Sequence, residues 1–145
     1  MNEPLKILIV EDEALLAMEL ESLIEENGHE VAGWATSLAE TQQVLGQVKP
    51  DIALVDIHLA DGPTGVEVAE FIRGNDLAEV VFLTANPKRI PEKFDGALGV
   101  ISKPYTINGI TAALRYLWEG VRRPPPDTAR PVGFDLVSPS QAYWI

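Results

Sequence analysis

Cysteine is absent from this chain of 145 residues, and basic residues are scarce. The lack of thiols excludes a disulfide framework, a thiolate zinc site and thiol catalysis, and it fits a reducing compartment. Eleven lysines and arginines stand against 22 aspartates and glutamates, which gives a net charge of −11. Because nucleic acid and anionic membranes repel such a protein, we expect neither as a partner.

Long apolar runs are missing as well. No stretch approaches the roughly 18 apolar residues that span a bilayer. The first residues, Met1-Asn2-Glu3-Pro4, lack the positive flank and the apolar core of a signal peptide. We therefore expect a soluble, cytoplasmic protein.

The negative charge is unevenly distributed along the chain. Residues 1–79 hold 17 acids and 3 bases, whereas residues 80–145 hold 5 acids and 8 bases. Two interpretations stay open, because the acidic half can either steer a partner toward one face or simply be a solvated surface.

Five short apolar runs predict buried parallel strands, since strands covered on both faces are continuously apolar. They lie at residues 5–10, 31–35, 52–55, 80–83 and 100–102. Amphipathic segments predict helices over about residues 13–28, 37–50, 66–74 and 107–119. Residues 85–99 contain Pro87 and Pro91 and predict a short or irregular element. Strands that alternate with helices indicate an α/β domain with a parallel sheet covered on both sides.

The chain changes character near residue 120. We expect one domain over residues 1–119 and a proline-rich C-terminal tail over residues 120–145, because Pro124-Pro125-Pro126 cannot continue a helix. The last four residues, 142–145, are apolar. They either pack back on the domain or form a docking peptide.

Polar residues follow the predicted strands at the edge of the sheet where parallel strands end, and ligands bind at that edge. They are Glu11, Asp12, Asp56, Thr84 and Lys103. Crowded carboxylates need a cation, and oxygen ligands favour Mg²⁺, which shares its shell with phosphate oxygens. Asp56 can ligate the metal with one oxygen and attack phosphorus with the other. Lys103 can neutralise the phosphoryl group and Thr84 can hydrogen-bond it.

Each of these residues taken alone also has an ordinary structural explanation. Asp12 or Glu13 suits a helix N-terminus, and Asp56 suits a loop cap. Thr84 is common in strands, and Lys103 suits a solvated surface. Chance placement of polar residues after four of the predicted strands is a weaker explanation than one shared site.

Four motifs closely resemble the receiver domain of two-component response regulators, in order and spacing, over about residues 5–119. They are Val10-Glu11-Asp12-Glu13, the segment LVDIHLADG at residues 54–62, Phe82-Leu83-Thr84-Ala85 and Ser102-Lys103-Pro104-Tyr105. The resemblance implies a doubly wound five-stranded parallel sheet of the flavodoxin-like or CheY-like type. Its strand order is expected to be 2-1-3-4-5, with helices on both faces.

The resemblance also implies a role for each site residue. Asp56 is expected to accept a phosphoryl group from a sensor histidine kinase or a phosphotransfer protein. Mg²⁺ is expected to be held by Glu11, Asp12 and Asp56, with the backbone carbonyl of His58 as a further ligand. Two more residues are expected to sense and stabilise the phosphoryl group, namely Thr84 and Lys103. The Lys103–Pro104 peptide bond is expected to be cis.

One position departs from the common receiver pattern. Many receivers carry an aromatic residue three positions before the lysine, and this chain has Val100 there. It therefore resembles a group of receivers, frequent in alphaproteobacteria, that lack the aromatic switch, and we expect activation to reorganise residues 85–99. The side chain of His58 either overhangs the phosphorylation site or is an ordinary exposed loop histidine.

The expected function is that of a single-domain receiver whose phosphorylation changes its affinity for a downstream protein partner. No DNA-binding helix pair follows Glu119. The alternative is a phosphate sink for a shared kinase, and oligomeric state stays open. An aspartyl-phosphate hydrolase of the haloacid dehalogenase type needs a second Asp where His58 stands, so no separate substrate turnover is expected. A flavodoxin-like cofactor binder needs a glycine-rich loop where residues 11–13 are acidic.

Overall fold

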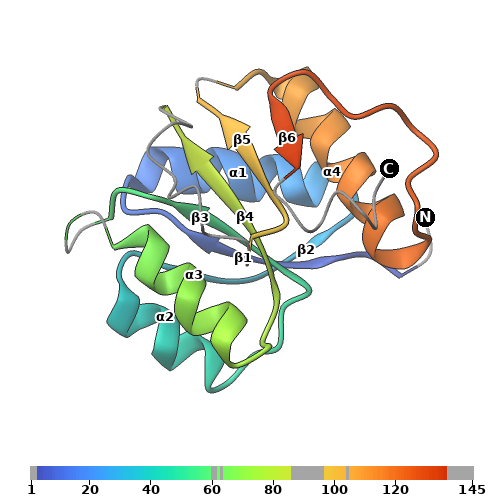
Figure 1. The fold of residues 1–145 in the computed structure, drawn as a ribbon. Coiled ribbons are helices and arrows are strands. Elements are labelled where there is room, and N and C mark those ends of the chain that lie inside the picture. Colours follow the sequence, from blue (N-terminus) through green and yellow to red (C-terminus); the bar gives the residue numbers. More distant parts are fainter. Residues whose placement is uncertain (1–2, 60–61, 63, 86–96, 104, 137–145) are drawn as a thin grey trace.

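A computed structural model describes residues 3–59, 62, 64–85, 97–103 and 105–136 of the chain (Figure 1). The strands are β1 (Lys6–Val10), β2 (Glu30–Ala35), β3 (Ile52–Asp56), β4 (Glu79–Thr84), β5 (Gly99–Ser102) and β6 (Phe134–Leu136). The helices are α1 (Ala14–Glu26), α2 (Leu38–Leu45), α3 (Gly65–Gly74) and α4 (Ile107–Arg122). Within these residues, no helix is long and apolar enough to cross a membrane.

The strands form one sheet in the order β2-β1-β3-β4-β5-β6. The first five strands are parallel to their neighbours, whereas β6 runs antiparallel to β5. This confirms the predicted α/β fold and the order of its five parallel strands. Strand order reverses between β1 and β3, which is where ligands bind in open parallel sheets.

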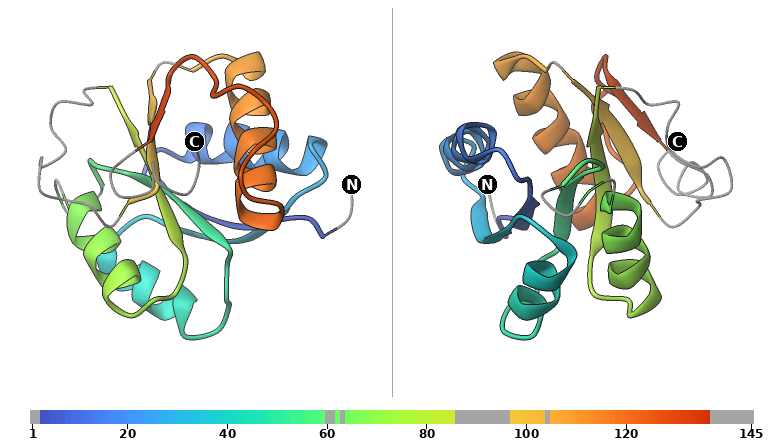
Figure 2. Two further views of the ribbon diagram at one scale, coloured as in Figure 1. Left: turned by 45° about the vertical axis from the view of Figure 1, so that its right-hand side comes forward. Right: turned by 90° about the vertical axis from the view of Figure 1, so that its left-hand side faces the viewer.

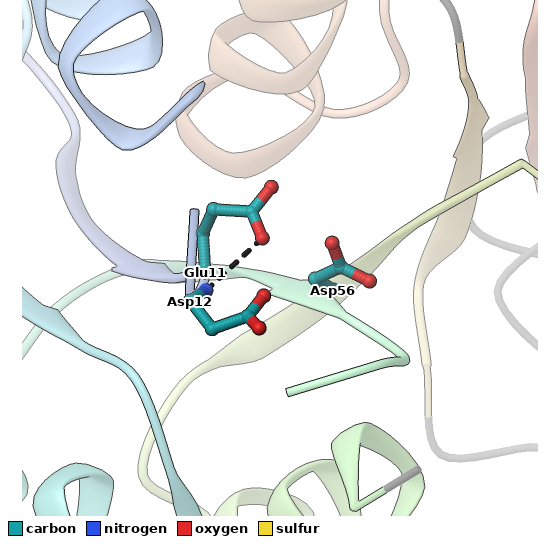
Figure 3. A group of neighbouring side chains, drawn as sticks. All are labelled: Glu11, Asp12 and Asp56. Carbon is teal, nitrogen blue, oxygen red and sulfur yellow. Dashed lines mark hydrogen bonds between the residues drawn. The ribbon is translucent and has the colours of Figure 1, made fainter. Parts of the chain in front are cut away.

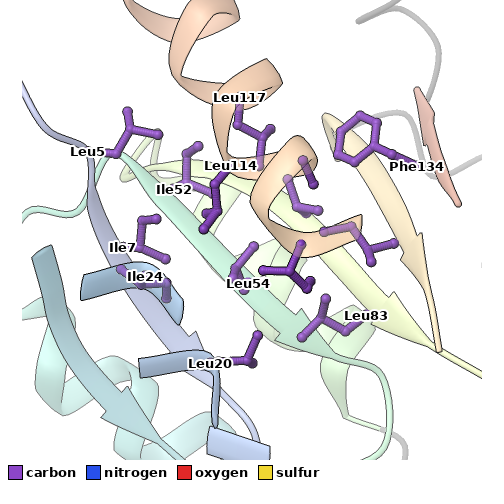
Figure 4. Packing of buried hydrophobic residues seen from close by; sticks show 14 of the residues in the cluster. Leu5, Ile7, Leu20, Ile24, Ile52, Leu54, Leu83, Leu114, Leu117 and Phe134 are labelled. Carbon is purple, nitrogen blue, oxygen red and sulfur yellow. The ribbon is translucent and has the colours of Figure 1, made fainter. Parts of the chain in front are cut away.

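Helices cover both faces of the sheet (Figure 2). Buried side chains of α1 and α4 pack with one set of strand residues, which includes Ile7, Leu54 and Leu83 (Figure 4). Buried side chains of α3 pack with the alternate set on the other face, and α2 adds partly buried residues there. Since successive strand residues point to opposite faces, two apolar layers require strands that are apolar throughout.

Local residues fix the ends of the helices. The Ser37 side chain accepts a hydrogen bond from Glu40 N at 3.2 Å, and the Thr106 side chain accepts one from Gly109 N at 2.8 Å. These caps satisfy backbone donors that the first turn of a helix leaves unpaired. Gly28 has a φ of 85° just after α1 and provides the left-handed residue that ends this helix.

Helix α4 is longer than the sequence predicts and ends at Arg122 rather than at Glu119. Contacts with distant segments stabilise this additional turn. Arg122 donates hydrogen bonds to the carbonyl oxygens of Glu3 and Pro4, and its guanidinium lies 2.9 Å from Asp51 Oδ2. The three prolines at residues 124–126 then prevent the helix from continuing.

The predicted tail contributes a sixth strand to the sheet. Phe134 and Leu136 of β6 are buried, and the Phe134 ring lies edge-on to Tyr116 with their centroids 5.5 Å apart. A Cβ on Gly99 would lie 2.8 Å from the carbonyl oxygen of Asp135, so this glycine allows β6 to approach β5. The boundary at residue 119 stays a prediction. Residues 142–145, most of residues 85–99 and the Lys103–Pro104 bond lie outside the described part of the chain.

Candidate functional site

The polar residues predicted to form the site lie at the carboxyl ends of four strands. Glu11 and Asp12 follow β1, Asp56 is the last residue of β3, Thr84 is the last residue of β4, and Lys103 follows β5. Parallel pairing aligns these strand ends, because Asp56 is paired with Leu83 and Thr84 with Ser102. The structure thus brings together residues that lie up to 92 positions apart.

Three carboxylates converge in the middle of this edge (Figure 3). Glu11, Asp12 and Asp56 each offer an oxygen, and these oxygens all lie within 4.8 Å of one another. Glu11 and Asp56 are buried and Asp12 is exposed, so the cluster is open on one side. Carboxylate oxygens crowded in this way repel one another, and a hard divalent cation compensates their charge. The donor set therefore fits Mg²⁺.

Burial has a strong effect on Glu11. It removes the carboxyl group from water and raises its pKa to about 7, and the neighbouring Asp56 adds to this shift. Lys103 opposes it, since its ammonium lies 3.0 Å from Glu11 Oε1. A proton or a cation is thus needed to stabilise this group of acids.

Lys103 links two of the acids. Its Nζ lies 2.6 Å from Asp56 Oδ2 as well as 3.0 Å from Glu11 Oε1. Burial alone would lower the pKa of the ammonium, but its hydrogen bonds to Asp56 and Glu11 outweigh burial and raise the pKa. Lys103 is therefore a permanent positive charge beside the carboxylate of Asp56.

The backbone around Asp56 fixes the other carboxylate oxygen. The N–H of His58 donates a hydrogen bond to Asp56 Oδ1 at 2.9 Å, while the His58 side chain is exposed. Helix α3 begins directly beneath this turn, where Gly65 N donates to Ile57 O at 2.9 Å. A Cβ on Gly65 would overlap the Asp56 carbonyl oxygen and Ile57 Cα. Only glycine lets α3 start so close to the end of β3.

Thr84 and Lys103 are joined through their backbones. Thr84 is 3% exposed, and its carbonyl oxygen accepts a hydrogen bond from Lys103 N at 2.8 Å. This bond extends the pairing of β4 and β5 to the edge that carries the carboxylates. It therefore connects the end of β4 directly to the residue that contacts Asp56.

Two residues close to Lys103 in the sequence, Val100 and Tyr105, are withdrawn from solvent in whole or in part. Val100 is 5% exposed and packs in the apolar layer beneath α3, at the position where many receivers carry an aromatic residue. The Tyr105 hydroxyl is buried and has no hydrogen-bond partner among the described residues. Burial raises the pKa of Tyr105 to about 12, so its hydroxyl stays protonated at neutral pH.

Trp34 is a further residue of the site, and no sequence motif identifies it. Its indole Nε1 donates a hydrogen bond to the Glu11 carbonyl oxygen at 2.7 Å, from a position on β2 next to the end of β1. A large aromatic residue at the end of an edge strand was the available signal. The sequence does not pair Trp34 with Glu11, because the indole contacts a backbone oxygen rather than a side chain.

An exposed apolar patch lies near this edge of the sheet. Leu15 and Met18 on α1 and Ile107 on α4 are 77%, 62% and 69% exposed. Together with Glu19 and Glu26 they line a shallow groove of about 600 Å³. Large exposed apolar side chains grouped in this way are typical of a surface that binds another protein.

A model of the response regulator receiver domain matches residues 7–115. The chain is 37% identical over 112 residues to the phyllosphere-induced regulator PhyR of Methylorubrum extorquens, an alignment that covers 75% of this chain and 42% of that protein. It spans about half the length of the first curated relatives that it matches.

Solved structures agree with this similarity. The receiver domain of PhyR from Erythrobacter litoralis has a TM-score of 0.72 and 29% identity, with 89% of this chain and 97% of that domain covered. The anti-anti-sigma factor PhyR from Bartonella quintana, solved in complex with the anti-sigma factor NepR, has a TM-score of 0.52 and 38% identity over 55% of this chain and 33% of that protein.

Proposed function

This chain belongs to the response regulator receiver domain family, and from that premise we propose that it is a phosphorylation-controlled signalling protein. In this proposal Asp56 accepts a phosphoryl group from a sensor histidine kinase or a phosphotransfer protein. The observation that carries it is the position of Lys103 Nζ, 2.6 Å from Asp56 Oδ2 and 3.0 Å from Glu11 Oε1. A buried acid beside a lysine ammonium and a metal-binding cluster suits phosphoryl transfer.

The proposed transfer takes place at the carboxylate of Asp56. A carboxylate oxygen of Asp56 bonds to phosphorus while the phosphorus–nitrogen bond of a phosphohistidine breaks. The imidazole leaves with the electron pair of that bond, and Asp56 becomes an acyl phosphate. When bound by Glu11, Asp12, Asp56 and the carbonyl of His58, Mg²⁺ would neutralise charge on the phosphoryl oxygens.

The chain's own side chains would complete the stabilisation of the phosphoryl group. Lys103 supplies a positive charge that can move from the carboxylate to a phosphoryl oxygen, since it sits on a flexible stem. Thr84 supplies a hydroxyl at the adjacent strand end. Receivers and their relatives are regulators rather than enzymes that turn over a separate substrate, so hydrolysis of the acyl phosphate is the one reaction that we expect beyond transfer.

We infer that the output is a change in affinity for another protein. The relative from Bartonella quintana was solved with a protein partner, and the groove at Leu15, Met18 and Ile107 offers an apolar surface beside the phosphorylation site. Both observations support a protein partner over nucleic acid. A cytoplasmic location agrees with phosphorylation by an intracellular kinase.

Intact-mass measurement tests the proposal directly. The protein is incubated with Mg²⁺ and acetyl phosphate, and one acid-stable, base-labile phosphoryl group is expected, which chelation of Mg²⁺ should prevent. Asp56→Asn should abolish the adduct. Asp76→Asn is the matched control, because that side chain is 93% exposed, and it should leave the adduct unchanged. Phosphorylation of the Asp56→Asn variant would contradict the proposal. A wild-type protein that no donor or kinase phosphorylates would contradict it as well.

A further inference from the structure

Trp34 is tied to the metal-binding acids through the backbone. Its indole N–H donates to the Glu11 carbonyl oxygen at 2.7 Å, which is a short and direct bond. Trp34 is paired with Ile9, so its side chain reaches along the neighbouring strand to the residue just past the end of β1. The bond therefore joins the edge strand of the sheet to the first residue of the site.

The peptide group between Glu11 and Asp12 is held on both sides. Trp34 binds its carbonyl oxygen, and its N–H, which belongs to Asp12, donates to Glu11 Oε2 at 3.1 Å. The N–H of Glu11 in turn donates to the carbonyl oxygen of Ala35 at 3.0 Å. Both acidic side chains leave the backbone at this peptide. The orientation of this peptide thus decides whether the carboxylate oxygens of Glu11 and Asp12 meet near Asp56.

The core of the protein does not require Trp34. The residue is 44% exposed and belongs to neither of the two apolar layers. Glu11 has no exposed surface, so its carbonyl oxygen depends on the Trp34 indole as its donor. An indole N–H held by the edge strand allows this carbonyl only one orientation.

We propose that Trp34 is a positioning residue that orients the Glu11–Asp12 peptide for Mg²⁺ binding. This inference rests on the proposed function, since it concerns the metal used in phosphorylation. Loss of the indole N–H leaves the ligands in place but lets their peptide rotate, so metal affinity falls while the chemistry at Asp56 is kept. The free protein also makes this bond, so the full net free energy of one hydrogen bond, about tenfold in affinity, is the upper limit, and we expect a loss of about threefold to tenfold.

Trp34→Phe and Trp118→Phe form a matched pair. The Trp118 indole also donates to a backbone carbonyl, that of Glu3 at 3.1 Å, but away from the acids. Calorimetric titration with Mg²⁺ should show affinity weakened about threefold to tenfold in Trp34→Phe and unchanged in Trp118→Phe. With acetyl phosphate, Trp34→Phe should need correspondingly more Mg²⁺ for half-maximal phosphorylation and approach the wild-type rate at saturation.

A spectroscopic measurement on a variant that keeps Trp34 tests the inference without relying on activity or on the folding of Trp34→Phe. In the variant with Trp118→Phe and Trp144→Phe, Trp34 is the remaining tryptophan, and Mg²⁺ should change its fluorescence and shift its indole N–H resonance. Equal Mg²⁺ affinity in Trp34→Phe and wild type, or an indole signal that Mg²⁺ leaves unchanged, would overturn the inference. Wild type that binds no Mg²⁺ would instead overturn the proposed function on which it rests.

Discussion

Lys103 Nζ lies 2.6 Å from Asp56 Oδ2, although 47 positions separate the two residues in the sequence. The same ammonium reaches Glu11 Oε1 at 3.0 Å, so one cation compensates two buried carboxylates. This arrangement places a positive charge at the proposed phosphoacceptor before any phosphoryl group arrives. Preformed charges of this kind stabilise a transition state without reorganisation at the moment of reaction.

Lys103→Ala is expected to slow phosphorylation by acetyl phosphate about a hundredfold, because it removes the charge that would neutralise the phosphoryl oxygens. The rate is measured by intact mass at saturating Mg²⁺. Lys49→Ala, at an exposed lysine before β3, is the control and should react at the wild-type rate. Equal rates in Lys103→Ala and wild type would show that the ammonium has no part in the transfer.

Gly65→Ala is expected to impair both folding and phosphorylation. The added Cβ overlaps the Asp56 carbonyl oxygen, so α3 must move away from the turn that presents Asp56. A clash with backbone costs about 1–3 kcal/mol in the free energy of unfolding, which urea denaturation measures. In Gly74→Ala the new Cβ meets nothing within 4 Å, so that variant should be as stable as wild type or more stable. Equal stability and equal phosphorylation of Gly65→Ala and wild type would contradict the argument.

The sequence predicts the parallel strands and the clustering of the acids because both follow from simple patterns. Residues 52–55 are apolar without interruption, and a short run of this kind between turn residues is typical of a strand covered on both faces. Once the strands are parallel, their carboxyl ends must share an edge. The meeting of Asp56 with Lys103 is therefore a consequence of topology, and it could be inferred without coordinates.

Contacts that depend on one tertiary approach could not be predicted in this way. Residues 134–136 are too short for a periodic pattern, and they form a strand because Phe134 packs on Tyr116 and Gly99 leaves room beside it. Trp34 likewise acts through a backbone oxygen of Glu11, which no side-chain motif records. Both features depend on individual atoms that meet only in the folded structure.

Phe134→Ala should lower the free energy of unfolding by about 3–5 kcal/mol, the usual cost of removing a fully buried aromatic ring. Phe134 is 2% exposed, so its ring is part of the core although it lies in the segment predicted to be a tail. Val132→Ala is the control in the same segment, because Val132 is fully exposed, and it should be close to neutral. Chemical denaturation compares the two. A Phe134→Ala variant as stable as wild type would mean that the segment is an appendage that adds nothing to the domain.

The buried Glu119 should make the attachment of this segment sensitive to acid. Its Oε1 accepts hydrogen bonds from Thr128 N at 3.0 Å and from Thr128 Oγ1 at 2.7 Å. Burial alone would raise the pKa of Glu119, but the bonds from Thr128 and the charges of Arg115 and Arg123 lower it below its usual value of 4.5. The folded protein therefore holds this carboxylate ionised more strongly than the unfolded chain does.

It follows that Glu119 contributes stability above pH 4.5, and that this contribution disappears as the pH falls through the lower pKa of the folded state. Glu119→Gln keeps an acceptor but loses the charge, and it should lower the free energy of unfolding at pH 7 by about 1–2 kcal/mol. The difference between wild type and Glu119→Gln, measured by urea denaturation across this range, should shrink toward acid pH. Glu70→Gln, at an exposed position on α3, is the control and should change the free energy of unfolding at pH 7 by less than about 0.5 kcal/mol. A difference that stays constant with pH would mean that Glu119 acts through packing alone, because only an ionised carboxylate with a lowered pKa loses its contribution on protonation.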